Sequence, residues 1–367
     1  MAKAVALLSG GLDSYLAVIM MLKQGIDVTA LTFLTSFGCD LSDTSLCSKN
    51  PFPVADKFGF EVRLCPLTDQ FIEIVKNPAF GRGKHMNPCI DCRILMLREA
   101  KKFMSLIGAD FIITGEVLGQ RPMSQRRDTF HIIDRESGLK GYVLRPLSAK
   151  LLPETAPEKT GLVERDMLCS FSGRSRKPQM RLAEEFGLTD YPAPAGGCLL
   201  TEPNYAYRLR ELFDHDPNPT LTDLFLLKVG RHFRVSPTDK IVIGRNKVEN
   251  EKILSLAGKE DYLLKVEGFG SPITLLSGKD SWEHIYLSSS LCARYSDAKH
   301  LPEVEVTVIR GSNASVFMDN GGSTNKGLRS SGGGHFPMII VAPADNEIAE
   351  HYRVEKRKEK MVRGTAT

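Results

Sequence analysis

The chain contains 367 residues, of which 42% are hydrophobic and 25% are charged, and its formal net charge is +4 at pH 7. This composition is typical of a globular protein, and the length allows two domains with a tail. No apolar run approaches the roughly 18 residues that span a bilayer, so we expect no membrane partner. The first residues, MAKAVALL, indicate a buried strand rather than a signal peptide, and we expect a cytoplasmic protein.

The first 200 residues alternate between strand-type and helix-type patterns. Apolar strand-type runs occupy residues 4–8, 28–34, 61–64, 111–114 and 142–144. Helix-period segments occupy residues 12–23, 54–58, 71–75, 90–107 and 178–186. Strands separated by helices predict an α/β fold with a parallel, Rossmann-like sheet that is covered on both faces. Ligands of such sheets bind at the carboxyl ends of the strands.

Beyond residue 200 the pattern changes to a smaller α+β module. One helix at 201–213 precedes short strand-type runs at 233–235, 240–243, 261–266, 273–276 and 304–309. A stretch rich in glycine and serine begins at 311, and one strand at 337–341 precedes a charged tail. We therefore expect a first domain over 1–200, a second over 201–310, and a loop and tail over 311–367.

Residues 9–14 read SGGLDS and directly follow the first apolar run. The two glycines allow a tight turn and a close approach of backbone N–H groups to an anion, and the helix that follows directs its positive end to the same point. The two serines are hydrogen-bond donors. Asp13 beside a polyphosphate calls for an intervening Mg²⁺ ion. The motif is neither a Walker A loop nor GxGxxG.

A strand, SGGxDS and a helix together resemble the signature of the ATP pyrophosphatase (PP-loop) family. This resemblance implies the adenine nucleotide alpha hydrolase fold, and an enzyme that adenylates a carbonyl oxygen and releases pyrophosphate. The segments 87–100, 113–125 and 143–150 resemble the catalytic domain of tRNA 4-thiouridine synthetases. The segment NPCIDC also resembles tRNA 2-thiouridylases, in which the residue matching Cys92 handles sulfur and Cys198 in PAGGCLL matches the second active cysteine.

The resemblance covers about residues 1–200 and departs from those families in two respects. The 4-thiouridine catalytic domain usually follows an RNA-binding domain, whereas this PP-loop begins at residue 9. RNA must therefore dock elsewhere, or the substrate is not tRNA. There are also three thiols, Cys89, Cys92 and Cys198, where the cysteine-pair enzymes use two.

The resemblance also implies which residues contact the nucleotide. Thr32 and Phe33, at the end of the second strand, would contact the adenine. Arg93 has a rationale of its own, because a guanidinium stabilises charge on phosphates. The expected ATP contacts are Leu8, Ser9, Gly10, Gly11, Asp13, Ser14, Thr32, Phe33, Arg93, Gly115 and Gln125.

Cys89 and Cys92 form a CxxC pair at the start of a helix, which alone is consistent with a redox pair, half a zinc site or part of an iron–sulfur site. A four-ligand zinc site would need Cys169 or His85 in addition to Cys198. Iron–sulfur members of the thiouridine-forming families resemble this chain, with a CxxC and one distant cysteine. That resemblance implies a 4Fe–4S cluster on Cys89, Cys92 and Cys198, with persulfide chemistry on a cysteine pair and zinc as the alternatives. Asp13 completes the catalytic set.

Residues 230–276 resemble the RNA-binding NFACT-R (DUF814-type) module, chiefly in IVIGRNKVEN and in the D-x-x-x-K-x-E-G-x-x-G-S-P pattern. Cationic and polar side chains at turns and strand ends suit phosphate contacts, although a solvated hairpin would show the same pattern. The expected RNA contacts are Arg126, Arg127, Arg231, His232, Arg245, Asn246 and Lys247.

Three functions follow as hypotheses. The first is an ATP-dependent tRNA sulfurtransferase that uses ATP, Mg²⁺ and the 4Fe–4S cluster, receives sulfur as sulfide or from a persulfide donor, and forms a homodimer. The second is a sulfur insertase that acts on a small molecule or cofactor. The third, a non-catalytic RNA-binding protein, is disfavoured by the intact SGGLDS.

Overall fold

The computed structural model describes residues 1–38, 50–67, 69–193, 198–279, 281–318 and 337–355. They form two compact units, Met1–Glu202 and Pro203–Thr367, and each is described by itself. Among the described helices, none is both long and apolar enough to cross a membrane.

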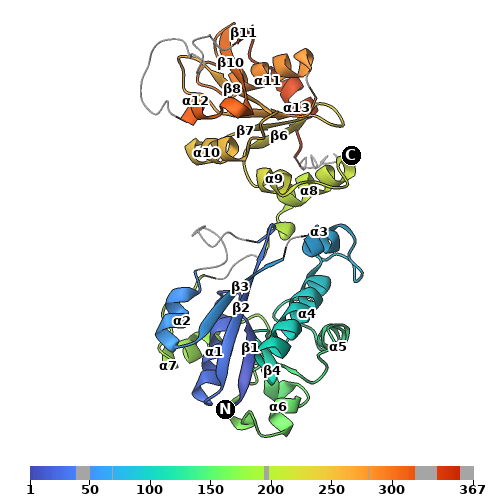
Figure 1. Ribbon diagram of the computed structural model, residues 1–367, viewed down its shortest axis with the longest axis vertical. Helices are drawn as coiled ribbons and strands as arrows, with labels where there is room; N and C mark the ends of the chain where they lie inside the picture. Colours follow the sequence, from blue (N-terminus) through green and yellow to red (C-terminus); the bar gives the residue numbers. More distant parts are fainter. Residues whose placement is uncertain (39–49, 68, 194–197, 280, 319–336, 356–367) are drawn as a thin grey trace, which may run out of the picture. The chain divides into compact units, whose positions relative to one another are not determined.

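The first unit contains a parallel five-stranded sheet in the order β3-β2-β1-β4-β5 (Figure 1). Its strands are β1 (Lys3–Leu7), β2 (Asp27–Thr35), β3 (Glu61–Leu67), β4 (Phe111–Thr114) and β5 (Val143–Leu144). The predicted α/β class with a parallel sheet is confirmed. Because β2 and β4 flank β1 on opposite sides, the strand order reverses beside β1, and this is where open α/β sheets bind ligands.

Helices cover both faces of this sheet. They are α1 (Leu12–Lys23), α2 (Phe52–Phe58), α3 (Asp69–Lys76), α4 (Cys89–Ile107), α5 (Arg127–Glu136), α6 (Ala156–Lys159) and α7 (Lys177–Glu185). The alternation along β1 divides the core: Ala4 and Ala6 pack in the cluster that contains α1, while Val5 and Leu7 pack in the cluster that contains α4. In Figure 1, α1, α2 and α7 lie on one side of the sheet and α4 and α5 on the other.

The second unit contains an antiparallel six-stranded sheet in the order β11-β10-β8-β9-β7-β6. Its strands are β6 (Arg231–Arg234), β7 (Lys240–Ile243), β8 (Tyr262–Val266), β9 (Thr274–Ser277), β10 (Val304–Arg310) and β11 (Met338–Val341). Its helices are α8 (Pro203–His215), α9 (Leu221–Leu226), α10 (Lys247–Leu256), α11 (Trp282–Arg294), α12 (Ser315–Met318) and α13 (Asn346–Tyr352). The predicted α+β module is confirmed.

The end of the described chain belongs to this second sheet. The strand expected near residues 337–341 is present as β11 and pairs with β10 from Val304 to Thr307. Ile339 and Val341 of β11 are buried in one core cluster with Val304 and Val306. The glycine-rich stretch from 319 to 336 and the tail from 356 lie outside the described residues.

Candidate functional site

The SGGLDS loop connects the carboxyl end of β1 to α1. Gly10 adopts φ of 71°, a left-handed conformation that glycine tolerates best. Ser14 Oγ donates to the Gly11 carbonyl at 2.8 Å, and Ser9 N donates to Ser14 Oγ at 3.3 Å. The loop is therefore held by its own side chains at the start of a twelve-residue helix.

The loop that follows β4 packs directly against SGGLDS. A Cβ atom on Gly115 would lie 2.5 Å from Ser14 N and 2.6 Å from the carbonyl carbon of Asp13. Only glycine fits here without a shift of one backbone or the other. The contact places Gly115 directly against SGGLDS, while the predicted roles of Gly115 and Gln125 in binding ATP stay predictions.

Asp13 lies at the centre of this contact. Gln120 Nε2 donates to its Oδ2 at 2.9 Å, while Asp13 Oδ1 is buried and has no hydrogen-bond partner among the described residues. Burial raises the pKa of Asp13, and the Gln120 hydrogen bond, Arg176 and Arg121 oppose that rise. The carboxylate thus has one oxygen fixed by the protein and one available to a ligand.

Further buried polar atoms near the loop lack partners within the described part of the chain. Thr32 follows Leu31, whose carbonyl accepts a hydrogen bond from Leu8 N at 2.9 Å. The atoms without a hydrogen-bond partner or ion pair are Thr32 Oγ1, Gln125 Oε1 and both amide atoms of Gln179. Native interiors leave few polar groups unsatisfied, so a concentration of them around one loop indicates a polar ligand.

Helix α7 supplies two residues that the sequence analysis did not single out. The Gln179 amide and the Arg176 guanidinium both lie near enough to Asp13 to lower its pKa. Gln179 itself is fully buried. In the sequence, both residues belong to the basic segment GRSRKPQMR (173–181). Such a segment is ordinarily a solvated surface, so it gave no indication of a contact with Asp13.

Arg93 is joined to the same region by a buried ionic network. Its Nε lies 3.5 Å from Glu116 Oε1. Glu116 Oε2 accepts from Arg145 Nε at 3.1 Å and from Thr114 Oγ1 at 3.2 Å. Arg145, 4% exposed, also binds both oxygens of Asp134, at 2.7 and 3.0 Å. Glu116 is thereby fixed and in turn orients Arg93.

The CxxC pair occupies the first turn of α4, as predicted. Helix α4 begins at Cys89 and places Cys92 nearly one turn later. Between them, the Asp91 carboxylate accepts hydrogen bonds from Ala79 N at 2.9 Å and Phe80 N at 3.2 Å. This anchors the start of α4 to the loop after α3.

Cys198 approaches the same helix from a distant part of the chain. It directly precedes the short 3₁₀ helix Leu199–Thr201. The Leu200 carbonyl accepts a hydrogen bond from Met86 N at 3.1 Å, three residues before Cys89. The structure therefore brings the segments of all three predicted cysteines together.

The three thiols influence one another electrostatically. Burial raises the pKa of Cys92 to about 12; Arg93 opposes the rise, and Cys198 and Cys89 add to it. Burial likewise raises the pKa of Cys198, and Cys89 adds to the effect. Without a bound metal ion, the thiols of Cys92 and Cys198 are therefore protonated near pH 7.

The other ligands considered for a zinc site are not gathered with these thiols. Within the described ranges, no group of three or more His, Cys, Asp or Glu residues is arranged to hold a metal ion, and this holds for Cys89, Cys92 and Cys198 themselves as well as for a set that adds Cys169 or His85. Cys169 packs against the core on the α1 side of the sheet, and burial raises its pKa to about 11. His85 lies in the loop before α4 with φ of 59°.

In the second unit, Arg231 and His232 are neighbours on β6 with different surroundings. Arg231 lies over the Tyr295 ring at 4.5 Å. His232 is 1% exposed, and its Nε2 donates to the Val229 carbonyl at 2.8 Å. Burial lowers the pKa of His232 well below its usual value. A phosphate contact through His232 would require this side chain to leave the core.

The remaining predicted RNA contacts lie at helix starts. Asn246 caps α10 by accepting from Glu249 N at 3.0 Å. Arg245 pairs with Glu249, and Lys247 has an 88% exposed side chain. In the first unit, Arg126 and Arg127 lie at the start of α5.

Two family models match the chain. One is described as thiamine biosynthesis protein (ThiI) and matches residues 1–150; the other is described as NFACT protein RNA binding domain and matches residues 230–318. Residues 1–150 are therefore similar to the ThiI family. The two family resemblances drawn from the motifs are confirmed at the level of these domains.

Curated relatives agree with the similarity to the ThiI family. A probable tRNA sulfurtransferase of Thermococcus kodakarensis is 29% identical over 147 residues, which is 40% of this chain and 36% of the relative. A tRNA-specific 2-thiouridylase MnmA of Pelotomaculum thermopropionicum is 26% identical over 347 residues, which is 83% of each chain. The chain thus spans about a third of the sulfurtransferase and most of the thiouridylase.

One solved structure resembles part of this chain, at a lower sequence identity than the curated relatives. The crystal structure of a 4-thiouridine synthetase–RNA complex with bound ATP is 22% identical, covers 51% of this chain and 52% of its own, and has a TM-score of 0.31.

Proposed function

We propose that this protein is an ATP-dependent tRNA sulfurtransferase that adenylates a uridine carbonyl oxygen and replaces that oxygen with sulfur. The observation that carries the proposal is the position of Arg93. It follows Cys92 in α4 and interacts with that thiol, and its guanidinium also faces Glu116 of the loop packed on SGGLDS. One side chain thus links Cys92 to the loop that packs on SGGLDS.

The ThiI-like domain would hold ATP at the carboxyl ends of β1, β2 and β4. Leu8, Ser9, Gly10, Gly11 and Ser14 would surround the phosphates. Thr32 and Phe33 would contact the adenine, and Gly115 and Gln125 would close the site beside Arg93. Asp13 would hold Mg²⁺ through its buried, unpartnered Oδ1, since hard cations prefer carboxylate oxygens. The unpartnered polar atoms around the loop support a polar ligand of this kind.

In the first step the uridine carbonyl oxygen attacks the α-phosphorus of ATP, and pyrophosphate leaves. In the second step sulfur attacks the ring carbon, the C–O bond breaks and AMP leaves. Arg93 would stabilise charge that develops on the phosphate in both steps. Asp13 and the glycine turn would hold the pyrophosphate portion in line with the attacking oxygen.

Cys89, Cys92 and Cys198 are the proposed sulfur-handling residues. Three partly buried thiols on segments joined by a hydrogen bond suit a 4Fe–4S cluster by their chemistry, because soft thiolates ligate iron, and a bound cluster would require the three side chains to move into a common ligand set. When bound, such a cluster would supply an iron able to carry hydrosulfide. The residues before Cys198, 194–197, lie outside the described part of the chain. A persulfide on a cysteine pair, with zinc or no metal, is the alternative.

The second unit would bind RNA. In 4-thiouridine synthetases this role falls to an RNA-binding domain that precedes the catalytic domain. Its match to an RNA-binding domain and the cations Arg231, Arg245 and Lys247 support this role, with Arg126 and Arg127 on the first unit. Sulfide or a persulfide would be the sulfur source, and we expect a homodimer.

Anaerobically purified wild type and Cys198→Ala test the proposal, with Cys169→Ala as the matched cysteine control. Iron and acid-labile sulfide are measured first, and then the ATP-dependent appearance of thiouridine in tRNA by mass spectrometry. About four irons per chain, lost in Cys198→Ala and kept in Cys169→Ala, would support the cluster. Thiolation without iron would leave the sulfurtransferase standing and remove the cluster. Absence of thiolation with tRNA binding insensitive to salt would favour a small-molecule substrate.

A further inference from the structure

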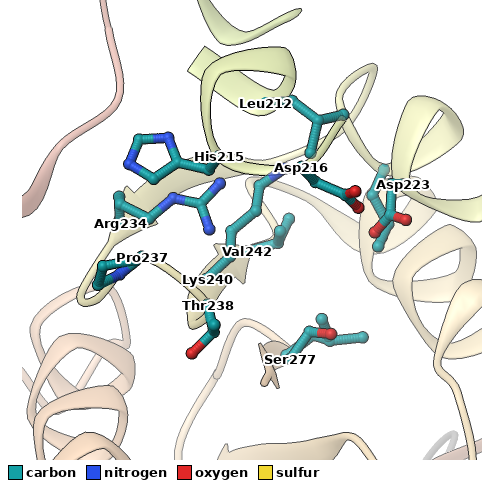
Figure 2. Close-up of a pocket in the computed structure, with 12 residues that line it drawn as sticks. Leu212, His215, Asp216, Asp223, Arg234, Pro237, Thr238, Lys240, Val242 and Ser277 are labelled. Carbon is teal, nitrogen blue, oxygen red and sulfur yellow. The ribbon is translucent and has the colours of Figure 1, made fainter. Parts of the chain in front are cut away.

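A pocket of about 210 Å³ lies wholly within the second unit, between helices α8 and α9 and one face of strands β6, β7 and β9 (Figure 2). Polar and charged side chains line one part of it, and leucine and valine side chains line the rest. Nothing in the ATP or cysteine chemistry proposed above uses it. Its lining is built from segments of sequence that share no motif.

Strand register places three polar residues in a row along the sheet side of this pocket. Arg234 of β6 pairs directly with Lys240 of β7, and Lys240 pairs directly with Ser277 of β9. Two residues further along the strands, Val242 and Leu275 form the next pair. Because side chains two apart share one face of a strand, polar residues form one end of this wall and apolar residues the other.

Lys240 is the unusual member of the row. It is 8% exposed, and its Nζ has no hydrogen-bond partner among the described residues. Burial lowers the pKa of Lys240 to about 8, so its amine is still mostly protonated at pH 7. A buried ammonium without an acceptor is costly, and a bound group that accepts its hydrogen bonds would remove that cost.

The charges that face Lys240 have mixed sign. Arg234 is held by Glu211 of α8 at 2.5 and 3.1 Å, so that cation is already paired. Asp216 follows α8, and Asp223 lies on α9. Figure 2 shows Lys240 reaching between Arg234 on one side and Asp216 and Asp223 on the other.

The other titratable groups around Lys240 come from α8 and from β6, where the buried His232 interacts electrostatically with Lys240. His215 lines the pocket, and Arg208 contributes to lowering the pKa of Lys240. With the Arg234–Glu211 pair set aside, the lining presents one ammonium opposite two carboxylates. Asp223 uses its Oδ2 to accept from Thr220 N and Oγ1 at the start of α9, and Asp216 uses its Oδ1 to accept from Asn218 N, so each carboxylate has one further oxygen to offer a ligand. A simple anion would meet Lys240 but also these carboxylates, whereas a ligand with both charges would satisfy each side.

We propose that this pocket binds a small zwitterion of the aliphatic α-amino acid class, whose carboxylate contacts Lys240 and whose ammonium faces Asp216 and Asp223. The apolar side chains of Leu212, Leu226, Val242 and Leu275 would receive its aliphatic part. The volume suits such a compound and is below the range usual for larger cofactors. The inference concerns the second unit alone and does not depend on sulfur transfer.

Isothermal titration calorimetry on the full chain tests the proposal with L-valine and its two single-charge analogues, isovalerate and isobutylamine. We expect valine to bind, and each analogue to bind at least about tenfold more weakly because one side of the pocket loses its partner. Lys240→Met should weaken valine binding by a similar factor. The exposed Lys252→Met on α10 is the matched control and should leave it unchanged.

A proton-uptake measurement separates a contact with Lys240 from a general effect of the substitution on folding. At pH 8 the free amine is about half protonated, and a bound carboxylate would raise its pKa. Valine binding in two buffers of different ionisation enthalpy should therefore show uptake of up to about half a proton by Lys240, lost in Lys240→Met.

Two results would overturn the proposal. One is the absence of valine binding at concentrations up to about 10 mM. The other is binding of inorganic phosphate or isovalerate as tight as that of valine, which would make the pocket an anion site.

Discussion

Gln120 donates a hydrogen bond from its side-chain amide to the carboxylate of Asp13 across 2.9 Å, although the two residues are 107 positions apart. The bond joins the loop after β4 to the first turn of α1. It fixes one oxygen of Asp13 and lowers the pKa that burial raises. Because of this hydrogen bond, the carboxylate of Asp13 stays charged to a lower pH than it would without Gln120.

Gln120→Ala should shift the pH dependence of Mg–ATP binding. Without the amide donor the pKa of Asp13 rises further, so the affinity should begin to fall at a higher pH than in wild type. Equilibrium binding of Mg–ATP between pH 5 and 8 measures the shift. Gln24→Ala, which alters a partly buried glutamine that pairs with the Glu164 backbone at the end of α1, should leave the profile unchanged. Identical profiles for Gln120→Ala and wild type would contradict the role of Asp13.

Gly115→Ala should weaken ATP binding strongly. The added Cβ would lie within 2.6 Å of backbone atoms of Asp13 and Ser14, so the nucleotide loop or the loop after β4 must move. We expect at least a tenfold lower affinity for ATP, measured by calorimetry, equivalent to about 1.4 kcal/mol. Gly59→Asn is the control: Gly59 has a left-handed backbone, and a Cβ atom added there would have no neighbouring atom within 4 Å. Its ATP affinity should stay at the wild-type value. Equal affinities for the two variants would show that the contact is unimportant.

Glu116→Gln should lower both stability and turnover. The substitution preserves shape but removes the charge that Arg145 and Arg93 share. Arg145 keeps Asp134, so we expect a loss of about 2 kcal/mol in the free energy of unfolding rather than complete unfolding. Urea denaturation gives this value. At a temperature where the variant is folded, a normal kcat would argue that Arg93 does not need Glu116 for its orientation.

Cys92 should react slowly with iodoacetamide in the metal-free protein. Its pKa of about 12 leaves little thiolate at pH 7. The rate of alkylation should rise about tenfold for each unit by which the pH is increased, as long as the pH stays below that pKa. Mass spectrometry of peptides after timed labelling measures the rate. The denatured chain provides the reference, in which Cys92 should react as an ordinary thiol. Equal rates in the folded and denatured chain at pH 7 would contradict the buried, protonated thiol.

The stability of the second unit should decrease as pH falls below about 6.5. His232 is buried with a lowered pKa, so below the usual histidine pKa the unfolded chain binds a proton that the folded chain does not. The free energy of unfolding should therefore rise with pH by up to about 1.4 kcal/mol per unit in the window just below 6.5. Urea denaturation at pH 5, 6 and 7 measures the slope, and His232→Asn should reduce it.

Much of the first unit could be predicted because its signals are local. Glycines at 10 and 11 after an apolar run predict a strand, a turn and a helix start, and β1, SGGLDS and α1 have this arrangement. The helix-period pattern at 90–107 likewise predicts α4, which begins one residue earlier at Cys89, and in the second unit a local apolar run predicts β11. Short elements with weaker periodicity, such as α5 and α10, were not predicted.

The composition of the site depended on tertiary structure. Gln120 and Gln179 meet Asp13, and Met86 pairs with Leu200, only after strand order and helix packing bring distant segments together. His232 was expected to contact RNA and Lys240 begins a strand-type run, yet both side chains are buried. Local sequence determines backbone conformation and the alternation of faces along a strand. Which polar side chains end up beside one another, and which lose water, is decided by long-range packing that no short segment encodes.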